Sequence, residues 1–259
     1  MKIPLYQVDA FTSTLFAGNP AAVCPLESWL PDQQLQNIAA ENNLAETAFF
    51  IPSNDGYHLR WFTPIAEVDL CGHATLAAAF VLFNKLNAGD EALKFQTRSG
   101  LLVVQRQANR LTLDFPSQPA LPCPVPDALI QGLGQKPERV LLARDYLVVF
   151  QSEQMVKALH PDMEKFMELN ALGVIATARG EQMDFVSRFF APKVGIPEDP
   201  VTGSAHCTLI PYWSRQLNKT TLHARQISAR GGELFCEDCG DRVKIAGEAV
   251  LYSEGHINL

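Results

Sequence analysis

Two stretches of this chain, residues 60–113 and 188–245, repeat one pattern, and this repeat constrains the fold more than any other feature. The matching strings are Arg60-Trp61-Phe62-Thr63-Pro64 with Arg188-Phe189-Phe190-Ala191-Pro192, Cys71-Gly72-His73-Ala74 with Thr202-Gly203-Ser204-Ala205, and Arg98-Ser99-Gly100-Leu101-Leu102 with Arg230-Gly231-Gly232-Glu233-Leu234. Matching positions are 128 to 132 residues apart, which is the size of an ordinary domain. Two copies are too few for a solenoid, so the repeat predicts two similar half-domains.

The two copies differ in one ionisable group. Adding the spacing of 128 residues between Arg60 and Arg188 to Glu46 gives Val174 as the matching position of the second copy. Residues 45–52 alternate as a strand, on which Glu46 shares a face with Ala48 and Phe50. Apolar surroundings of this kind suit a carboxyl group to proton transfer, whereas a solvated strand-edge glutamate is the alternative. Glu46 is therefore the best candidate for general acid–base catalysis. The difference between the two copies points to an active site built between them.

Composition excludes several classes of protein. Hydrophobic residues make up 47% and charged residues 19% of the 259 residues, as in soluble globular proteins. The net charge of −7, without a basic run, argues against nucleic acid as a partner. The longest apolar run, residues 76–83, is too short to cross a bilayer, and Met1-Lys2-Ile3-Pro4-Leu5 lacks a signal-peptide core. Six scattered cysteines form no disulfide framework, so the cytoplasm is the expected location.

The order of predicted elements indicates an α+β fold. Each half contains several strands and one apolar helix, over residues 74–83 and residues 204–216. The first helix is apolar all round, so it is expected to be buried on every side. This predicts two pseudo-symmetric lobes, each a mixed sheet wrapped around a central helix. Five prolines between residues 116 and 126 mark a linker, which gives lobes 1–116 and 117–259, with the last strand a candidate to pack back on the first lobe.

Both predicted helices begin at a glycine-containing turn, at Gly72 and at Gly203. A helix N-terminus binds anions through its unpaired backbone N–H groups and its dipole. If the halves pack with pseudo-twofold symmetry, the two turns face each other and a small carboxylate can bridge them. Plain helix starts are the alternative reading of each turn taken alone.

Polar side chains flank these two turns. His73 lies at the first helix start, where the dipole favours a neutral imidazole. Asp199 precedes the second turn and is expected either to orient His73 across the interface or to cap the second helix. A Ser–His–Asp hydrolase built from Ser204, His206 or His73, and Asp199 is a weaker hypothesis, because the chain lacks the Gly-x-Ser-x-Gly elbow.

The cysteines allow two further readings. Cys71 precedes a helix, where a lowered pKa would suit a proton-transferring thiolate. A two-thiol racemase would need a second cysteine at the matching position, which holds Thr202, while Cys207 lies about one turn further on. The pair Cys236-x-x-Cys239 has no second pair to complete a zinc site, so two ordinary cysteines near a turn are the better interpretation.

Four strings in order resemble the PhzF-like phenazine-biosynthesis proteins, which have the diaminopimelate epimerase fold. They are Phe16-Ala17-Gly18-Asn19-Pro20-Ala21-Ala22-Val23, Asn43-Leu44-Ala45-Glu46-Thr47-Ala48-Phe49, Cys71-Gly72-His73-Ala74-Thr75 and Asp199-Pro200-Val201-Thr202-Gly203-Ser204-Ala205. The resemblance runs from the first strand to the last hairpin. It implies two lobes with the site in the cleft between them, a homodimer, and neither a cofactor nor a metal.

The resemblance also implies a role for each site residue. In the family's phenazine enzyme a glutamate moves a proton between carbons of a cyclohexadiene carboxylic acid, and Glu46 matches it. Three further side chains match family positions at the site, and two glycines match the turns that hold the substrate carboxylate. The side chains are His73, Asp199 and Ser204, and the glycines are Gly72 and Gly203.

The sequence thus predicts a cofactor-free isomerase of a small carboxylate. The cysteine at position 71 is a feature that this chain shares with the epimerases, so the identity of the substrate stays open. An amino-acid racemase using Cys71 is one alternative. A module that binds a small molecule or a partner without turnover is the other, since fold does not fix function.

Overall fold

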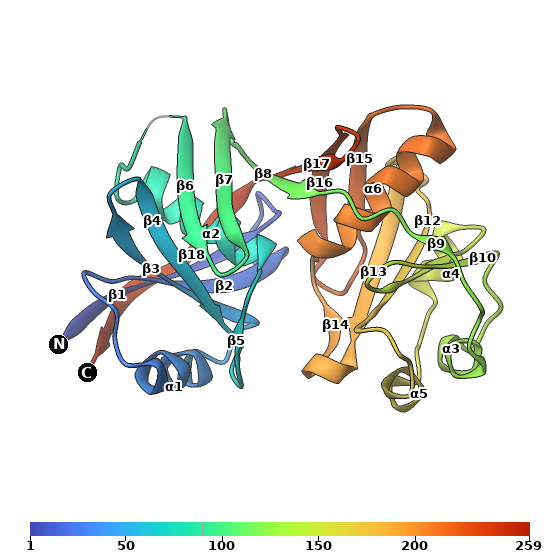
Figure 1. Cartoon of the computed structure of the whole chain (residues 1–259), viewed down its shortest axis with the longest axis horizontal. Coiled ribbons are helices and arrows are strands. Elements are labelled where there is room, and N and C mark those ends of the chain that lie inside the picture. Colours follow the sequence, from blue (N-terminus) through green and yellow to red (C-terminus); the bar gives the residue numbers. More distant parts are fainter. Residues whose placement is uncertain (90) are drawn as a thin grey trace. The chain divides into compact units, whose positions relative to one another are not determined.

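The computed structural model describes residues 1–89 and 91–259 and divides the chain into two compact units (Figure 1). The first unit contains Met1–Asp114 and Ala246–Leu259, and the second contains Phe115–Ile245. The predicted lobes met after residue 116, whereas the units divide after Asp114. The C-terminal segment belongs to the first unit because β18 (Ala249–Asn258) pairs antiparallel with β1 (Lys2–Ala10).

The first unit is a mixed sheet with two helices. Its further elements are β2 (Asn19–Pro25), α1 (Asp32–Asn42), β3 (Glu46–Ser53), β4 (Gly56–Phe62), β5 (Glu67–Val68), α2 (Gly72–Asn84), β6 (Ala92–Thr97), β7 (Gly100–Gln107) and β8 (Arg110–Pro116). β2 runs parallel to β3, β3 antiparallel to β4, and β4 parallel to β6. Parallel and antiparallel pairs in one sheet confirm the predicted α+β class.

The helix α2 is the core of the first unit. Every residue from His73 to Ala79 is buried, as the all-round apolar pattern predicted. The helix packs against β1, β2 and β3, so the sheet curls around it (Figure 1). Because α2 is buried from His73 to Ala79, its first turn is held in place, and with it the residues at positions 71 to 73.

The second unit has the same plan. Its elements are β9 (Leu121–Pro122), α3 (Asp127–Leu133), β10 (Arg139–Leu142), β11 (Tyr146–Val149), α4 (Glu153–Lys157), α5 (Met163–Met167), β12 (Val174–Arg179), β13 (Phe185–Ala191), a 3₁₀ turn (Pro192–Val194), β14 (Ile196–Asp199), α6 (Gly203–Leu217), β15 (Thr221–Gln226), β16 (Gly232–Asp238) and β17 (Arg242–Gly247). The helix α6 packs against β15 and β16. The predicted linker between residues 116 and 126 contains β9.

The repeat contains a matching ion pair in each unit. Arg60 of β4 donates from Nε and Nη2 to the two carboxylate oxygens of Glu67, at 2.7 and 2.8 Å. Arg188 of β13 donates in the same way to Glu198, at 2.7 and 2.9 Å. Forked arginine–carboxylate pairs fix geometry as well as charge. The repeated arginines are therefore structural, since each ties a strand to the short strand that follows it.

The strand register corrects one prediction. In the first unit Thr47 pairs with Phe62, and in the second Val174 pairs with Phe190. Phe62 and Phe190 are matching positions of the repeat, so Val174 corresponds to Thr47. The prediction that Val174 matches Glu46 is wrong by one residue. A shift of one residue in a strand reverses the face, so the comparison of an acid with a valine does not hold.

The true counterpart of Glu46 is Gly173. A Cβ atom added to Gly173 would lie 2.6 Å from Cζ of Phe189 and 2.9 Å from the carbonyl oxygen of Phe190. Contacts this short exclude a side chain without rearrangement. In the second unit an aromatic ring thus occupies the space beside the backbone at this position.

Candidate functional site

Glu46 and His73 form a buried pair in the first unit. Glu46 opens β3 and His73 is the second residue of α2, and they are 8% and 5% exposed. The Oε2 atom of Glu46 lies 2.9 Å from Nε2 of His73. The structure therefore brings together two of the predicted catalytic side chains, one from a strand and one from a helix start.

Asn19 and Cys71 approach the other nitrogen of the same imidazole. Nδ2 of Asn19 lies 3.1 Å from Nδ1 of His73, and Sγ of Cys71 lies 3.6 Å from it. An amide that donates to Nδ1 leaves the proton of a neutral imidazole on Nε2, directed at Glu46. The orientation of the amide is assigned from this network. Asn19 was not among the predicted site residues, although it lies in one of the strings that carried the resemblance.

Burial and charge oppose each other at this cluster. Burial disfavours the imidazolium, yet the adjacent Cys71 and Glu46 raise the pKa of His73 well above its usual value. The Glu46 carboxylate in direct contact with His73 thus acts against the helix dipole, which favours a neutral imidazole. Burial, followed by the charge of Glu46, raises the pKa of Cys71 to about 11. The expected thiolate at Cys71 is therefore wrong, and at neutral pH the group is a thiol.

The same cluster offers donors that metals accept. One ligand atom from each of Glu46, Cys71 and His73 lies within 4.8 Å of the others. Thiolate, imidazole and carboxylate are zinc ligands. Both imidazole nitrogens are engaged, however, Nε2 by Glu46 and Nδ1 by Asn19 and Cys71. A metal would have to displace one of these contacts, so the arrangement fits a hydrogen-bonded proton relay better than a ligand set.

Asp199 is tied to the start of α6 in the second unit. Its carboxylate accepts a hydrogen bond of 2.5 Å from Oγ1 of Thr202, the residue before the helix. Gln226, fully buried on β15, donates to the Asp199 carbonyl at 2.6 Å and accepts from the Thr202 N–H at 2.9 Å. No sequence pattern pointed to Gln226 as a site residue. Asp199 is consequently part of the structure around this helix start, although its carboxylate accepts from the Thr202 side chain and α6 has no side-chain cap hydrogen bond.

Ser204 and His206 have separate partners. Oγ of Ser204 accepts from Nη2 of Arg144 at 3.0 Å, and Arg144 also donates to Asp145. The Nδ1 atom of His206 lies 2.8 Å from the carbonyl oxygen of Thr202, and burial lowers the pKa of His206 to about 4. His206 is thus a neutral structural histidine. A hydrolase relay from Ser204 to His206 is contradicted.

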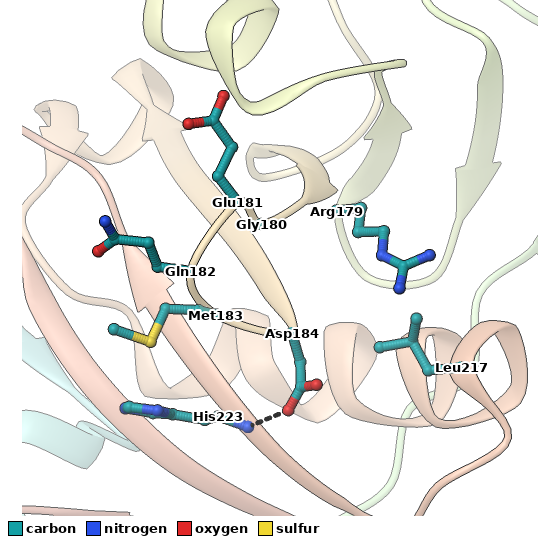
Figure 2. A pocket seen from close by; sticks show the side chains of 8 residues that line it. All are labelled: Arg179, Gly180, Glu181, Gln182, Met183, Asp184, Leu217 and His223. Carbon is teal, nitrogen blue, oxygen red and sulfur yellow. Dashed lines mark hydrogen bonds between the residues drawn. The ribbon is translucent and has the colours of Figure 1, made fainter.

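Two cavities lie elsewhere. One, of about 320 Å³, opens beside the turn between β12 and β13, where the Asp184 carboxylate accepts a hydrogen bond from the backbone N–H of His223 (Figure 2). Its lining residues are Arg179, Gly180, Glu181, Gln182, Met183, Asp184, Leu217 and His223. The other, of about 470 Å³, lies between α1 and the C-terminal residues. The predicted site residues line neither cavity, so these hollows are distinct from the predicted site.

Each unit therefore has a polar cluster at the start of its buried helix, within the α+β architecture of diaminopimelate epimerase-like proteins. The chain belongs to the phenazine biosynthesis-like protein family (PhzC-PhzF), whose family model matches residues 8–255. This confirms the resemblance read from the four strings. No helix in the described residues is long and apolar enough to cross a membrane.

Three known proteins show the extent of the similarity. An uncharacterized isomerase of Pseudomonas aeruginosa is 52% identical over 259 residues, which is 100% of both chains. A PhzF family protein of Enterococcus faecalis has a crystal structure with a TM-score of 0.98, 49% identity and 100% coverage of both chains. A hydroxyproline epimerase of Agrobacterium vitis matches with a TM-score of 0.63 at 11% identity over 99% and 92% of the two chains, which shows the fold alone. The isomerase name of the 52% identical relative supports an isomerase-type reaction.

Proposed function

We propose that this protein is an isomerase that moves a proton between carbon atoms of a small carboxylate, with Glu46 as the acid and base and without a cofactor. The observation that carries this proposal is the buried contact of Glu46 with His73, which is itself held by Asn19. A carboxylate in a dry, hydrogen-bonded setting is a suitable group for proton transfer.

The reaction needs no other reactant. The Glu46 carboxylate takes a proton from carbon, the C–H bond breaks, and its electron pair spreads into the adjacent unsaturated system as an enolate-like anion. The proton on Glu46 then returns to a different carbon. His73, whose Nε2 atom lies 2.9 Å from Oε2, steadies the carboxylate and adjusts its basicity through the reaction.

The carboxylate of the substrate needs donors. In our proposal the backbone N–H groups at Gly72 and Gly203 and the hydroxyl of Ser204 supply them, because both glycines open helices with unpaired N–H groups. Asp199, bonded to the hydroxyl of Thr202, steers the intermediate or relays a second proton.

A racemase that uses Cys71 is less well supported. A thiol with a pKa of about 11 is protonated at neutral pH and is a poor base. A binding module without turnover is the remaining alternative, and a single experiment separates it from the enzyme.

That experiment is an NMR screen of small unsaturated and amino carboxylic acids in D₂O. We expect wild type to introduce deuterium at carbon in one of them. Glu46→Gln should lower this rate by on the order of 10³ or more, since it removes the acid/base group. Glu41→Gln, at an exposed position of α1, is the matched control and should behave as wild type. Equal exchange in Glu46→Gln and wild type would overturn the proposal, and ligand binding without exchange would favour the binding module.

A further inference from the structure

The second unit has its own buried acid, on a neighbouring strand. Tyr146 pairs with Val174 in the parallel strands β11 and β12, so Asp145 lies beside Gly173, the counterpart of Glu46. Ala21 pairs with Glu46 in the first unit and occupies the position that Asp145 holds in the second. The two units therefore both have a buried carboxylate at this end of the sheet, although on different strands.

Asp145 is paired with an arginine, unlike Glu46. Arg144 donates from Nε at 3.0 Å and from Nη2 at 2.7 Å to the same oxygen of Asp145, which is 3% exposed. The Nη2 atom also donates to Oγ of Ser204 at 3.0 Å. One side of the guanidinium is thus anchored, and its position relative to the start of α6 is fixed.

The anchored arginine retains donors. A guanidinium has five N–H donors, and its Nη1 atom has no acceptor within hydrogen-bond distance among residues 1–89 and 91–259. The Arg144 side chain is 40% exposed, so Nη1 can be reached from solvent. Because arginine only donates, Ser204 must accept, and its own hydroxyl proton is directed to another group.

We infer that Arg144 is a specificity-determining residue that binds a carboxylate group of the substrate together with the hydroxyl of Ser204. This inference rests on the proposed function, since it concerns the same substrate. Two donors, Nη1 of Arg144 and Oγ of Ser204, match the two oxygens of a planar carboxylate. Asp145 offsets much of the charge of Arg144, and the remaining positive charge suits a monoanion better than a doubly charged phosphate.

The test is a titration of ¹⁵N-labelled protein with benzoate, its neutral isostere benzamide, and inorganic phosphate. We expect benzoate to shift the amide signals of Gly203 and Ser204 in wild type, and to bind more tightly than benzamide or phosphate. Arg144→Gln should weaken benzoate binding about tenfold or more, the size of a charge-assisted hydrogen bond, and leave benzamide unchanged. Arg215→Gln, at the other end of α6, is the matched control and should match wild type.

A further variant keeps the test decisive. Arg144→Lys keeps the positive charge but loses the two parallel N–H donors of the guanidinium, so it should bind benzoate more weakly than wild type and more tightly than Arg144→Gln. This comparison can still be made with Arg144→Lys and wild type if Arg144→Gln folds poorly. Benzoate has no acidic carbon-bound proton for Glu46 to move, so a failure of the proposed proton transfer does not affect this binding result. Benzoate binding that is absent from wild type, equal in Arg144→Gln, or no tighter than phosphate binding would overturn the inference.

Discussion

Glu46 and Asn19 contact opposite nitrogens of one buried imidazole, Glu46 at 2.9 Å from Nε2 and Asn19 at 3.1 Å from Nδ1 of His73. The three side chains come from β3, β2 and the first turn of α2. A histidine held on both sides has a defined ring orientation, and its protonation depends on its two neighbours. The first two predictions follow from this arrangement.

The stability provided by the Glu46–His73 pair should fall as the pH rises. The pKa of His73 is raised in the folded protein, against burial, by Cys71 and Glu46. A histidine whose pKa is raised by folding stabilises the folded protein fully at a pH below its pKa in the unfolded chain, which is about 6.5. This stabilisation is lost as the pH rises through the pKa of the histidine in the folded protein. Urea denaturation should therefore show a larger difference between wild type and Glu46→Gln near pH 6 than near pH 9. A difference that grows with pH would contradict this.

Replacing Asn19 should alter the pH dependence of proton transfer. Asn19→Asp offers only acceptors to Nδ1 and so favours a proton there, which stabilises the imidazolium. We expect the pH–rate profile to shift and the rate at neutral pH to fall on the order of 10², the lower range for acid–base groups. Asn54→Asp, in the exposed turn between β3 and β4, is the control and should keep the wild-type profile. An unchanged profile in Asn19→Asp would show that the amide does not control the imidazole.

His206 should destabilise the protein in mild acid. Burial lowers its pKa to about 4, so its neutral form is the one that the fold accepts. The free energy of unfolding keeps the contribution of neutral His206 above the histidine pKa of the unfolded chain, about 6.5, and loses it as the pH falls toward 4. The expected loss in the free energy of unfolding is about 2 kcal/mol between pH 7 and pH 5. Urea denaturation of wild type and His206→Gln at pH 7 and pH 5 tests this, because the variant should not show the loss of stability that comes from protonating His206.

Thiol labelling should distinguish the cysteines. Cys71 is buried and its pKa is raised to about 11, whereas Cys239 is exposed. We expect iodoacetamide at neutral pH to modify Cys239 in the native protein and to leave Cys71 unmodified until denaturant is added. Mass spectrometry of the peptides gives the result. Cys71→Ser should accordingly retain activity, and rapid labelling of native Cys71 would revive the racemase hypothesis.

A side chain at the counterpart of Glu46 should be costly. Gly173→Ala places a Cβ atom 2.6 Å from the ring of Phe189, which predicts a loss of about 1–3 kcal/mol from overpacking. Gly255→Ala is the matched control, since a Cβ there meets no atom within 4 Å and the residue is also in a strand. Chemical denaturation of both variants compares the losses. Equal stability of the two would mean that Phe189 moves aside easily.

Several features of the fold were predictable because they depend on local patterns. The all-round apolar composition of residues 74–83 predicted a helix buried on every side, and α2 is such a helix. The repeated arginines predicted two similar halves, and each makes the same forked pair. Four ordered strings predicted the family, which the match over residues 8–255 confirms. The short helices α3 and α4 were not predicted, since seven- and five-residue helices have weak periodicity.

The site was less predictable than the fold. Glu46 and His73 were predicted as site residues on separate grounds, and only packing shows that they touch. Asn19, Gln226 and Arg144 gave no independent chemical signal, because amides and arginines occur everywhere and their partners are distant in the chain. Gln226, for example, contacts residues more than twenty positions away.

Residue spacing and local hydrophobic pattern were enough to predict the two-fold repeat, the buried helices and the family. The strand register that makes Gly173, not Val174, the counterpart of Glu46 exists only in the folded sheet. Folding also buries Cys71 and brings the Glu46 carboxylate into contact with His73, and the pKa values of both groups rise, against the effect of the helix dipole. A pKa depends on every charge and solvent molecule within a few ångströms, and those neighbours exist only after the chain has folded.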